Sequence, residues 1–552
     1  MSERTVADIV AHEVAARAST VFGLMGNGNA YFVNGVLSEG VQYVRVRHEG
    51  ASVAAADAHW RSSRAIAVAT TTYGPGFTNI VTALAEAAKA RVPLVLIVGD
   101  APASGPRPID VDQGAIATAV GVRTITVTDA ASARVRTAEA FDLAHRDLIP
   151  VVLALPSDVA ESPATPEAEA GAVESAAPAA VADAPAPAPD EIEAVLAILT
   201  GARRPLILGG WGAWLADAGG DLRAAGDQVG ALFASSVFGR NIFGDTEWDL
   251  GIAGGFASAP RAELMAQADA VLVVGASLNP FTSRFGRLFH PDATVTQVDL
   301  AETATSPRVN RYLRADAGAF AAMLRERAAS LPETTGWRAD VALPAGDEWG
   351  VADVPEYLED GRLDPRVLSA ALERLLPEQR SIVLDGGHFV GWPAAFWHAN
   401  DPAGYLLIGS AYNTIGLGFP SALGAAVARP DRTVVLATGD GGGLMALPDL
   451  ASAVAAARSL IVVVYNDAAY GAELHQYGSR GLAVEPALLE QTDFAVLARG
   501  MGASGITVRS VADLSALDEW IARGATGTIV LDCLVSPSVI APFFQEIMSL
   551  PH

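Results

Sequence analysis

Short apolar runs of strand length alternate with alanine-rich stretches of helical length along most of the chain. In the first part of the sequence the predicted strands cover residues 20–23, 41–46, 65–70, 92–98, 122–127 and 150–155, and most of them are nearly continuous apolar runs. Nearly continuous apolar runs are typical of strands buried on both faces of a parallel sheet. Because helical stretches separate them, the pattern predicts a doubly wound α/β sheet for this region.

Two further regions repeat this alternation. Their clearest strands are 205–210, 270–275 and 294–299 in the second region, and 381–385, 433–438, 460–465 and 528–532 in the third. A stretch rich in Ala, Pro and Glu and a polar stretch with Pro and Gly separate the regions and are typical of linkers. We therefore predict an α/β protein with three doubly wound parallel-sheet domains. Their bounds are 1–162, 190–332 and 363–552, with linkers at 163–189 and 333–362.

The composition narrows the class of protein. The 552 residues are enough for several hydrophobic cores. The 62 acidic residues exceed the 37 basic ones, and the net charge of -25 disfavours binding to nucleic acid or to an anionic membrane. The single cysteine, Cys533, excludes an intrachain disulfide framework and a multi-cysteine metal cluster. No apolar run has the length of a membrane span, and charges interrupt the N-terminus, so we expect a soluble cytoplasmic protein.

The strongest candidate chemistry follows two predicted strands of the third region. Gly439-Asp440-Gly441 comes after the strand 433–438, and Asn466-Asp467 comes after the strand 460–465. Parallel strands joined by a crossover place both aspartates at the carboxyl edge of the sheet. Glycines and a helix start favour a phosphate there, and Mg²⁺ commonly links phosphate oxygens to protein carboxylates. The pattern predicts a Mg²⁺-diphosphate site; the alternative is a glycine turn and a strand exit without a ligand.

This arrangement resembles the thiamine diphosphate motif of the pyruvate decarboxylase and acetolactate synthase family, and the resemblance covers nearly the whole chain. It implies pyrimidine-binding, central and diphosphate-binding domains, in this order. It also implies that Asp440, the side chain of Asp467 and the backbone oxygen of Ala469 hold Mg²⁺, while Gly441 and Gly442 meet the diphosphate. The family usually has Asn where this chain has Asp467. Because a carboxylate oxygen can replace the amide oxygen, we expect metal binding to survive.

Two candidate catalytic residues lie in the first region. Glu49 follows the strand 41–46, and the resemblance implies that its carboxyl group shares a proton with the aminopyrimidine ring of the cofactor. A solvated glutamate in the first turn of a helix is the alternative. Gln113 aligns with a catalytic-site glutamine of the family's synthases, where simple pyruvate decarboxylases have a histidine pair. A polar surface residue in a loop is the alternative for Gln113.

Further cofactor contacts are implied in two glycine-containing segments of the third region. By the resemblance, Ile415 would prop the cofactor into a bent shape, and Asn413 would offer its backbone oxygen to the amine. A close packing turn between helix and sheet is the alternative for this segment. Gly386 and His388 match a second diphosphate contact, although His388 stands where the family often has Gln.

Two more features bear on the reaction and on the cofactors. Glu473 falls where simple 2-oxo acid decarboxylases place a second catalytic carboxylate, and some acyl-transferring members also carry Glu there. A solvated first-turn glutamate is the alternative. In the central region, the segment 209–212 lacks the spaced glycines of a dinucleotide fingerprint, and the segments at 254–257 and 275–278 differ from those of FAD-binding synthases. We therefore do not expect FAD.

Taken together, these features predict a thiamine diphosphate- and Mg²⁺-dependent enzyme acting on a 2-oxo acid. The first expectation is carboligation of the enamine to a carbonyl acceptor, as in acetolactate synthase. A non-oxidative decarboxylase releasing an aldehyde and a non-catalytic cofactor-binding homologue are the alternatives. The resemblance implies that Glu49 of one chain meets Asp440 and Asp467 of another, so we expect a homodimer at minimum, with a homotetramer as the usual assembly. The sequence does not identify the 2-oxo acid or its acceptor.

Overall fold

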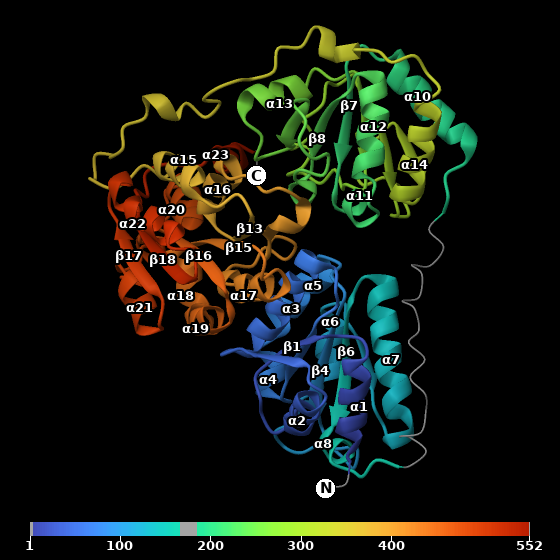
Figure 1. The fold of residues 1–552 in the computed structure, drawn as a ribbon, viewed down its shortest axis with the longest axis vertical. Coiled ribbons are helices and arrows are strands. Elements are labelled where there is room, and N and C mark those ends of the chain that lie inside the picture. Colours follow the sequence, from blue (N-terminus) through green and yellow to red (C-terminus); the bar gives the residue numbers. More distant parts are fainter. Residues whose placement is uncertain (1–3, 166–184, 551–552) are drawn as a thin grey trace. The chain divides into compact units, whose positions relative to one another are not determined.

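A computed structural model describes residues 4–165 and 185–550. Its strands form three six-stranded sheets. The described residues, drawn as a ribbon in Figure 1, divide into two compact units by their contacts. One unit contains residues 4–165, 379–390 and 406–537, and it holds the first and third sheets. The other contains residues 185–378, 391–405 and 538–550, and it holds the central sheet.

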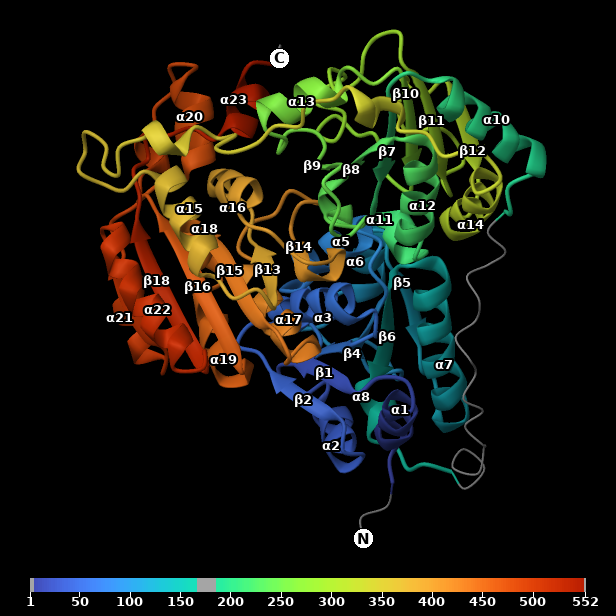
Figure 2. The ribbon, with the colours of Figure 1, turned by 45° about the horizontal axis from the view of Figure 1, so that its top comes forward.

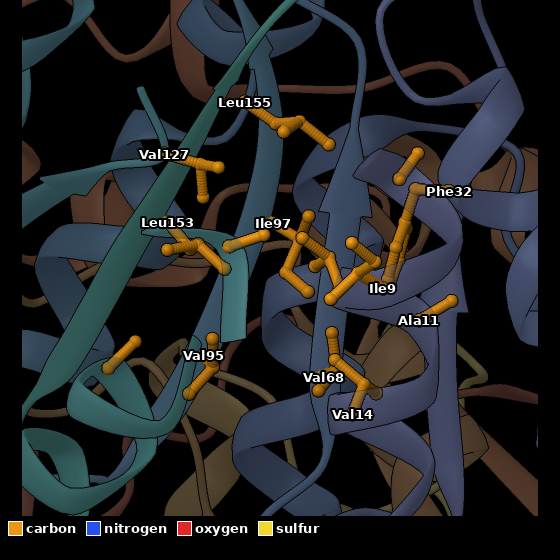
Figure 3. Close-up of a cluster of buried hydrophobic side chains, with 14 of the residues drawn as sticks. Ile9, Ala11, Val14, Phe32, Val68, Val95, Ile97, Val127, Leu153 and Leu155 are labelled. Atoms are coloured by element: carbon orange, nitrogen blue, oxygen red, sulfur yellow. The ribbon is translucent and has the colours of Figure 1, made fainter. Parts of the chain in front are cut away.

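The first sheet has the strand order β2-β1-β3-β4-β6-β5, and its paired strands are parallel. The strands are β1 (Thr20–Gly23), β2 (Gln42–Arg45), β3 (Val68–Thr71), β4 (Leu94–Asp100), β5 (Arg123–Thr126) and β6 (Pro150–Pro156). The helices are α1 (Val6–Ala15), α2 (Ala30–Ser38), α3 (Glu49–Ser63), α4 (Pro75–Thr78), α5 (Val81–Lys89), α6 (Gln113–Ala119), α7 (Ala130–Asp147) and α8 (Ser157–Ala160). A buried apolar cluster that includes Ile9, Phe32, Val95 and Leu153 packs helices onto one face of this sheet (Figure 3).

The central sheet has the order β12-β11-β10-β7-β8-β9, again with parallel pairs. The strands are β7 (Pro205–Gly209), β8 (Leu232–Ser235), β9 (Asp249–Ile252), β10 (Ala270–Val274), β11 (Thr294–Asp299) and β12 (Arg311–Arg314). The helices of this unit are α10 (Pro189–Gly201), α11 (Trp211–Leu215), α12 (Gly219–Val229), α13 (Ala259–Met265), α14 (Ala317–Ala328), α15 (Pro365–Leu375), α16 (Gly391–Phe396) and α23 (Pro542–Met548). Separate apolar clusters containing Ile207 and Leu206 cover opposite faces, as a doubly wound sheet requires.

The third sheet has the order β14-β13-β15-β16-β18-β17. The strands are β13 (Arg380–Leu384), β14 (Tyr405–Leu407), β15 (Thr433–Gly439), β16 (Ser459–Asn466), β17 (Ser504–Val508) and β18 (Gly527–Leu534). The helices are α17 (Gly418–Ala428), α18 (Asp440–Met445), α19 (Leu447–Ala456), α20 (Gly471–Gly478), α21 (Phe494–Gly500) and α22 (Ser515–Ala522), and a 3-10 turn, η4, spans His388–Val390. β15 and β16 are buried along nearly their whole length, which explains their unbroken apolar sequences.

Helices α3 and α17 pack against each other and connect the first and third sheets within their unit (Figure 2). α3 consists largely of small residues and is buried along almost its whole length. A Cβ atom at Gly424 of α17 would lie 2.1 Å from the carbonyl oxygen of Ala55, so glycine is needed for this close approach. Both helices begin at or directly after segments that carry predicted site residues.

The predicted α/β architecture with three parallel sheets is confirmed. The sequence pattern identifies only the clearest strands of the second and third regions and misses β8, β9, β12, β14 and β17, which have three to five residues each. Most of the predicted linker at 163–189 falls on residues 166–184, which lie outside the described residues, and the domain bounds remain predictions. Among the described helices, none combines the length and the hydropathy needed to cross a membrane.

Candidate active site

The carboxyl ends of β15 and β16 lie side by side and carry the two aspartates predicted to bind metal. The strands are paired in parallel, with Gly439 opposite Tyr465. Asp440 is the first residue after β15, and Asp467 is the first residue after β16. One carboxylate therefore leaves each strand at the same edge of the sheet, as the sequence predicts.

Asp440 is a carboxylate in a buried position, with only 2% of its surface exposed. Burial, with a smaller contribution from the Asp532 carboxylate, raises the pKa of Asp440 to about 6. Hydrogen bonds from the N–H groups of Gly441 and Ala468 oppose this rise. Because a buried anion is costly without a compensating charge, Asp440 has the properties of a ligand for a divalent cation.

The loop after β16 supplies two further groups that fit a metal ion. Ala468 has a left-handed backbone with φ 58°, a conformation that costs about 1–2 kcal/mol for a residue with a Cβ atom. A hydrogen bond from Leu489 N–H to Ala468 O holds the loop, and Ala469 N–H donates to Asp467 Oδ1 at 3.2 Å. Within the described residues the carbonyl oxygen of Ala469 accepts no backbone hydrogen bond, so it can serve as a ligand.

Two carboxylates and one carbonyl oxygen match the preference of Mg²⁺ for oxygen ligands. Within residues 4–165 and 185–550, no group of three or more His, Cys, Asp or Glu side chains is arranged to hold a metal ion. The edge of the third sheet thus fits a site in which the protein contributes few side chains. The remaining ligands of such a site come from phosphate and water.

The glycines after Asp440 are explained by close packing. Asp440 begins α18 directly, so this segment is the first turn of a helix and not the glycine turn that the sequence suggests. Neither Gly441 nor Gly442 has a positive φ. A Cβ atom at Gly441 would lie 2.5 Å from the Tyr470 ring, and one at Gly442 would lie 2.9 Å from Asp385 Oδ2. Both glycines therefore allow α18 to lie against neighbouring segments of the site.

Asp385, directly after β13, begins the segment predicted as a second diphosphate contact, but the sequence analysis assigns it no role of its own. It is buried, and its Oδ1 accepts hydrogen bonds from the N–H groups of Gly386, Gly416 and Leu417 at 2.8, 3.0 and 3.3 Å. Its Oδ2 accepts a hydrogen bond from Thr438 Oγ1 at 3.1 Å. Burial raises the pKa of Asp385, and these hydrogen bonds oppose the rise. An aspartate at the end of a buried strand is the signal that could have identified it.

Asn413 and Ile415 lie in a loop, residues 409–417, that we call the cofactor loop after its predicted role. Asn413 has a left-handed backbone with φ 57°, which Asn tolerates better than most residues. The loop packs against the segment after β13, because a Cβ atom at Gly386 would lie 2.8 Å from Thr414 O and 2.9 Å from Ile415 Cγ2. The structure thus brings the predicted residues Gly386 and Ile415 together.

His388 is buried in η4 beside His475 of α20, with 4.8 Å between the ring centroids. Burial, with a contribution from His475, lowers the pKa of His388 to about 3, so its imidazole is neutral near pH 7. A Cβ atom at Gly471 would lie within 3.4 Å of both Asp467 and His388, which places the histidine pair beside the predicted metal loop. Glu473, in the first turn of α20, is exposed.

Glu49 begins α3 close to the end of β2, as predicted. His48 caps the helix by accepting the Gly50 N–H through Nδ1 at 3.2 Å. The half-buried Glu49 carboxylate accepts a hydrogen bond from Asn79 Nδ2 through Oε2 at 2.9 Å. In the described part of the chain it makes no hydrogen bond or ion pair with the edge of the third sheet, so its second oxygen is available to a ligand.

Gln113, the predicted catalytic-site glutamine, has both ends of its side-chain amide hydrogen-bonded to other segments around the first sheet. It is buried at the start of α6. Its Oε1 accepts the Gly74 N–H at 2.8 Å, and its Nε2 donates to Gly99 O at 3.0 Å and to Asp100 Oδ1 at 3.1 Å. Because both ends of the amide are used, this geometry suits a residue that positions the Gly-Pro-Gly segment, residues 74–76 at the start of α4, better than one that contacts a substrate.

The central sheet has a topological switch point between β7 and β10, a place where doubly wound sheets often bind nucleotides. Here the segments at the carboxyl ends of the two strands are joined by backbone hydrogen bonds. The N–H of Gly210 donates to Val274 O at 2.9 Å, and that of Gly212 donates to Gly275 O at 2.8 Å. These glycines serve the packing of the two loops, and the expectation about FAD remains a prediction.

Three family models match the chain in order. They are the N-terminal TPP binding domain of thiamine pyrophosphate enzymes at residues 4–119, the central domain at 192–324 and the C-terminal TPP binding domain at 385–533. Together the matches span more than half of the chain. The first match includes Glu49, and the last includes the carboxyl edge of the third sheet.

Two known proteins and one solved structure extend this similarity. The acetolactate synthase large subunit of Parasynechococcus marenigrum (strain WH8102) is 28% identical over 490 residues, covering 85% of this chain and 77% of that protein. The sulfoacetaldehyde acetyltransferase of Castellaniella defragrans is 26% identical over 586 residues, covering 98% and 94%. The thiamine diphosphate-dependent 4-hydroxybenzoylformate decarboxylase of Rhodococcus jostii RHA1 aligns with a TM-score of 0.78 and 21% identity, over 97% of this chain and 99% of that one. The last likeness concerns the fold alone.

Proposed function

Because the chain belongs to the thiamine pyrophosphate enzyme family, we propose that this thiamine diphosphate-dependent enzyme decarboxylates a 2-oxo acid and joins the remaining acyl group to a carbonyl acceptor. The observation that carries the proposal is the edge of the third sheet, where Asp440 and Asp467 leave neighbouring strands. Similarity to an acetolactate synthase and to an acetyltransferase supports transfer of the acyl group to an acceptor.

We assign Mg²⁺ to Asp440, Asp467 and the carbonyl oxygen of Ala469. A cation at this position compensates the buried charge of Asp440 and keeps its carboxylate ionised. Diphosphate oxygens would complete the metal's ligands, next to Gly441 and Gly442 of α18 and to Gly386 and His388 after β13. The neutral imidazole of His388 suits a hydrogen bond to a phosphate oxygen without adding charge.

Glu49, Asn413 and Ile415 would hold the ring part of the cofactor. Bound thiamine diphosphate supplies the electron sink that stabilises the carbanion formed on decarboxylation. Glu49 would share a proton with the pyrimidine ring, while Asn79 keeps its carboxylate oriented. The backbone oxygen of Asn413 would accept a hydrogen bond from the amine, and Ile415 would support the bent cofactor. Gln113 would act indirectly, by positioning the Gly-Pro-Gly segment.

A second candidate reaction is decarboxylation with release of an aldehyde, and Glu473 favours it. This carboxyl group lies in the first turn of α20, just after the loop that carries Asp467. From there it could donate the proton that releases an aldehyde, whereas carboligation needs a carbonyl acceptor instead of a proton. The non-catalytic alternative is set aside, because the chain belongs to an enzyme family and retains both Glu49 and Asp440.

The proposed functional unit is a homodimer at minimum, with a homotetramer as the larger alternative. Several large apolar side chains beyond strand ends of the first and third sheets are exposed: Met25, Ile109, Val111, Tyr412, Met445 and Leu488. Exposed apolar groups of this size are typical of surfaces that a partner covers. A second copy of the chain would cover them and could bring Glu49 of one chain to Asp440 of another.

The reaction is tested by incubating the purified protein with thiamine diphosphate, Mg²⁺ and pyruvate, with and without a second 2-oxo acid or an aldehyde, and identifying the products by NMR. A hydroxyketone or hydroxy-oxo acid product supports the proposal. A free aldehyde as the main product, reduced by Glu473→Gln, establishes the decarboxylase instead. Absence of CO₂ release from a broad panel of 2-oxo acids contradicts both reactions.

A further inference from the structure

The cofactor loop is held near both ends by buried carboxylates from other parts of the chain. Near its C-terminal end, Asp385 accepts the N–H groups of Gly416 and Leu417. Near its N-terminal end, Glu86 of α5 accepts the Tyr412 N–H through Oε2 at 2.7 Å, and the Ala411 N–H through Oε1 at 3.3 Å. Asn413 and Ile415 lie between these two attachments.

Glu86 is part of a buried charge cluster and is itself only 1% exposed. The Arg61 guanidinium of α3 lies 3.6 Å from Glu86 Oε1, measured from Nη2, and it forms a bidentate pair with Asp57 at 2.6 and 3.2 Å. Arg61 and Asp57 are also buried. Burying a carboxylate costs free energy. The negative charge of Glu86 therefore needs compensation from Arg61 and from hydrogen bonds with backbone N–H groups.

The backbone of the loop is irregular, so it needs hydrogen bonds from other segments to hold one conformation. Asn413 has a left-handed conformation, and Gly409 has a φ of 102°. A Cβ atom at Gly409 would lie 2.4 Å from Thr414 O, while the Thr414 N–H donates to Gly409 O at 2.8 Å. The two N–H groups that Glu86 accepts directly precede Asn413. Their orientation therefore sets the direction of the Asn413 backbone.

We propose that Glu86 is a positioning residue that fixes the cofactor loop in the conformation able to bind thiamine diphosphate; this inference rests on the proposed function. Glu86 acts through the backbone at 411–412 and does not itself touch the cofactor. Its partner Arg61 lies on α3, the helix that begins at Glu49. The same charge cluster therefore also links the cofactor loop to the helix that carries the proposed proton-sharing carboxylate.

The test measures cofactor binding to the full-length metal-free protein, in the absence of substrate. Thiamine diphosphate is titrated with excess Mg²⁺, and binding is followed by tryptophan fluorescence and by the near-ultraviolet circular dichroism of the bound cofactor. Glu86→Gln removes the charge and one acceptor, and it should weaken cofactor binding about tenfold or more. Glu86→Asp keeps the charge but withdraws it from the loop, so it should show the same loss and remains informative if Glu86→Gln does not fold.

Glu13→Gln is the matched control. Glu13 is also buried in the first sheet's helices, and among the described residues its ion pairs are with Arg17 and Arg134, not with the cofactor loop. This variant should lose thermal stability while binding the cofactor like the wild type. Wild-type affinity in both Glu86 variants would overturn the inference and leave the proposed function intact. Failure of the wild-type protein itself to bind thiamine diphosphate would instead contradict the proposed function.

Discussion

At the scale of single residues, replacement of Glu49 should change catalysis without changing the fold. Its half-buried side chain takes one hydrogen bond, from Asn79, which the amide oxygen of glutamine can also accept. Glu49→Gln should therefore fold normally and lose general acid–base function, with kcat lowered about 10²- to 10⁴-fold. Steady-state kinetics with a thermal melt of the same sample check this. Full turnover by the variant would remove Glu49 from the catalytic assignment.

The two aspartates should respond differently to replacement by asparagine. Asp440→Asn removes a buried charge that needs a cation, so Mg²⁺ binding should weaken roughly tenfold or more. Asp467→Asn keeps an oxygen ligand in the same place, so binding should change only a few-fold. Titration of Mg²⁺ into EDTA-treated protein with thiamine diphosphate, followed by fluorescence, measures both. Equal losses in the two variants would contradict the assigned roles.

The buried His388 should make the stability of the protein sensitive to acid. Burial lowers its pKa from 6.5 to about 3, so the folded state resists protonation that the unfolded state accepts. Its contribution to stability is present above pH 6.5 and is lost as the pH falls towards 3, by on the order of a few kcal/mol. His388→Gln should therefore lose less stability than the wild type between pH 6.5 and 4.5 in thermal melts. Parallel pH curves would show that His388 does not titrate this way.

At the scale of elements, the sequence could predict those parts of the candidate site that depend on short local patterns. The apolar runs before Asp440 and Asp467 identify buried parallel strands, and parallel pairing alone places both residues at one edge. The rest depends on contacts between distant segments that no local pattern contains. Tyr412 donates to Glu86 across 326 positions, and the partners of Gln113 lie directly before α4 and at the end of β4. The predicted role of Gln113 therefore rests on the resemblance to the family. Its hydrogen-bond partners could not be predicted, because they are distant in the sequence and meet only in the folded chain.

Replacing two adjacent glycines of helix α12 by alanine should change the stability in opposite directions, because their surroundings differ. A Cβ atom at Gly219 would lie 2.3 Å from Ile242 O, whereas one at Gly220 would meet nothing within 4 Å. Gly220→Ala should stabilise the central unit by about 0.5–1 kcal/mol, because alanine favours the helix and restricts the unfolded chain. Gly219→Ala should destabilise it by about 1–3 kcal/mol through the clash with backbone. Urea unfolding of both variants measures the difference, and shifts of the same sign would contradict the packing of α12.

At the scale of the whole molecule, the exposed apolar residues near the carboxyl ends of the strands test the proposed dimer. Met25 is 65% exposed and Ile109 is 63% exposed, and they follow β1 and β4 of the first sheet. If a second chain covers them, Met25→Lys and Ile109→Lys bury a charge in the interface and should raise the dimer dissociation constant roughly tenfold or more. Val135→Lys is the matched control, because Val135 is 66% exposed within helix α7 and does not belong to the loops that follow β1 and β4. Sedimentation velocity across a concentration series, with activity assayed on the same samples, should show that the first two variants dissociate and lose activity together. A wild-type protein that sediments as a fully active monomer would show that one chain completes its own site.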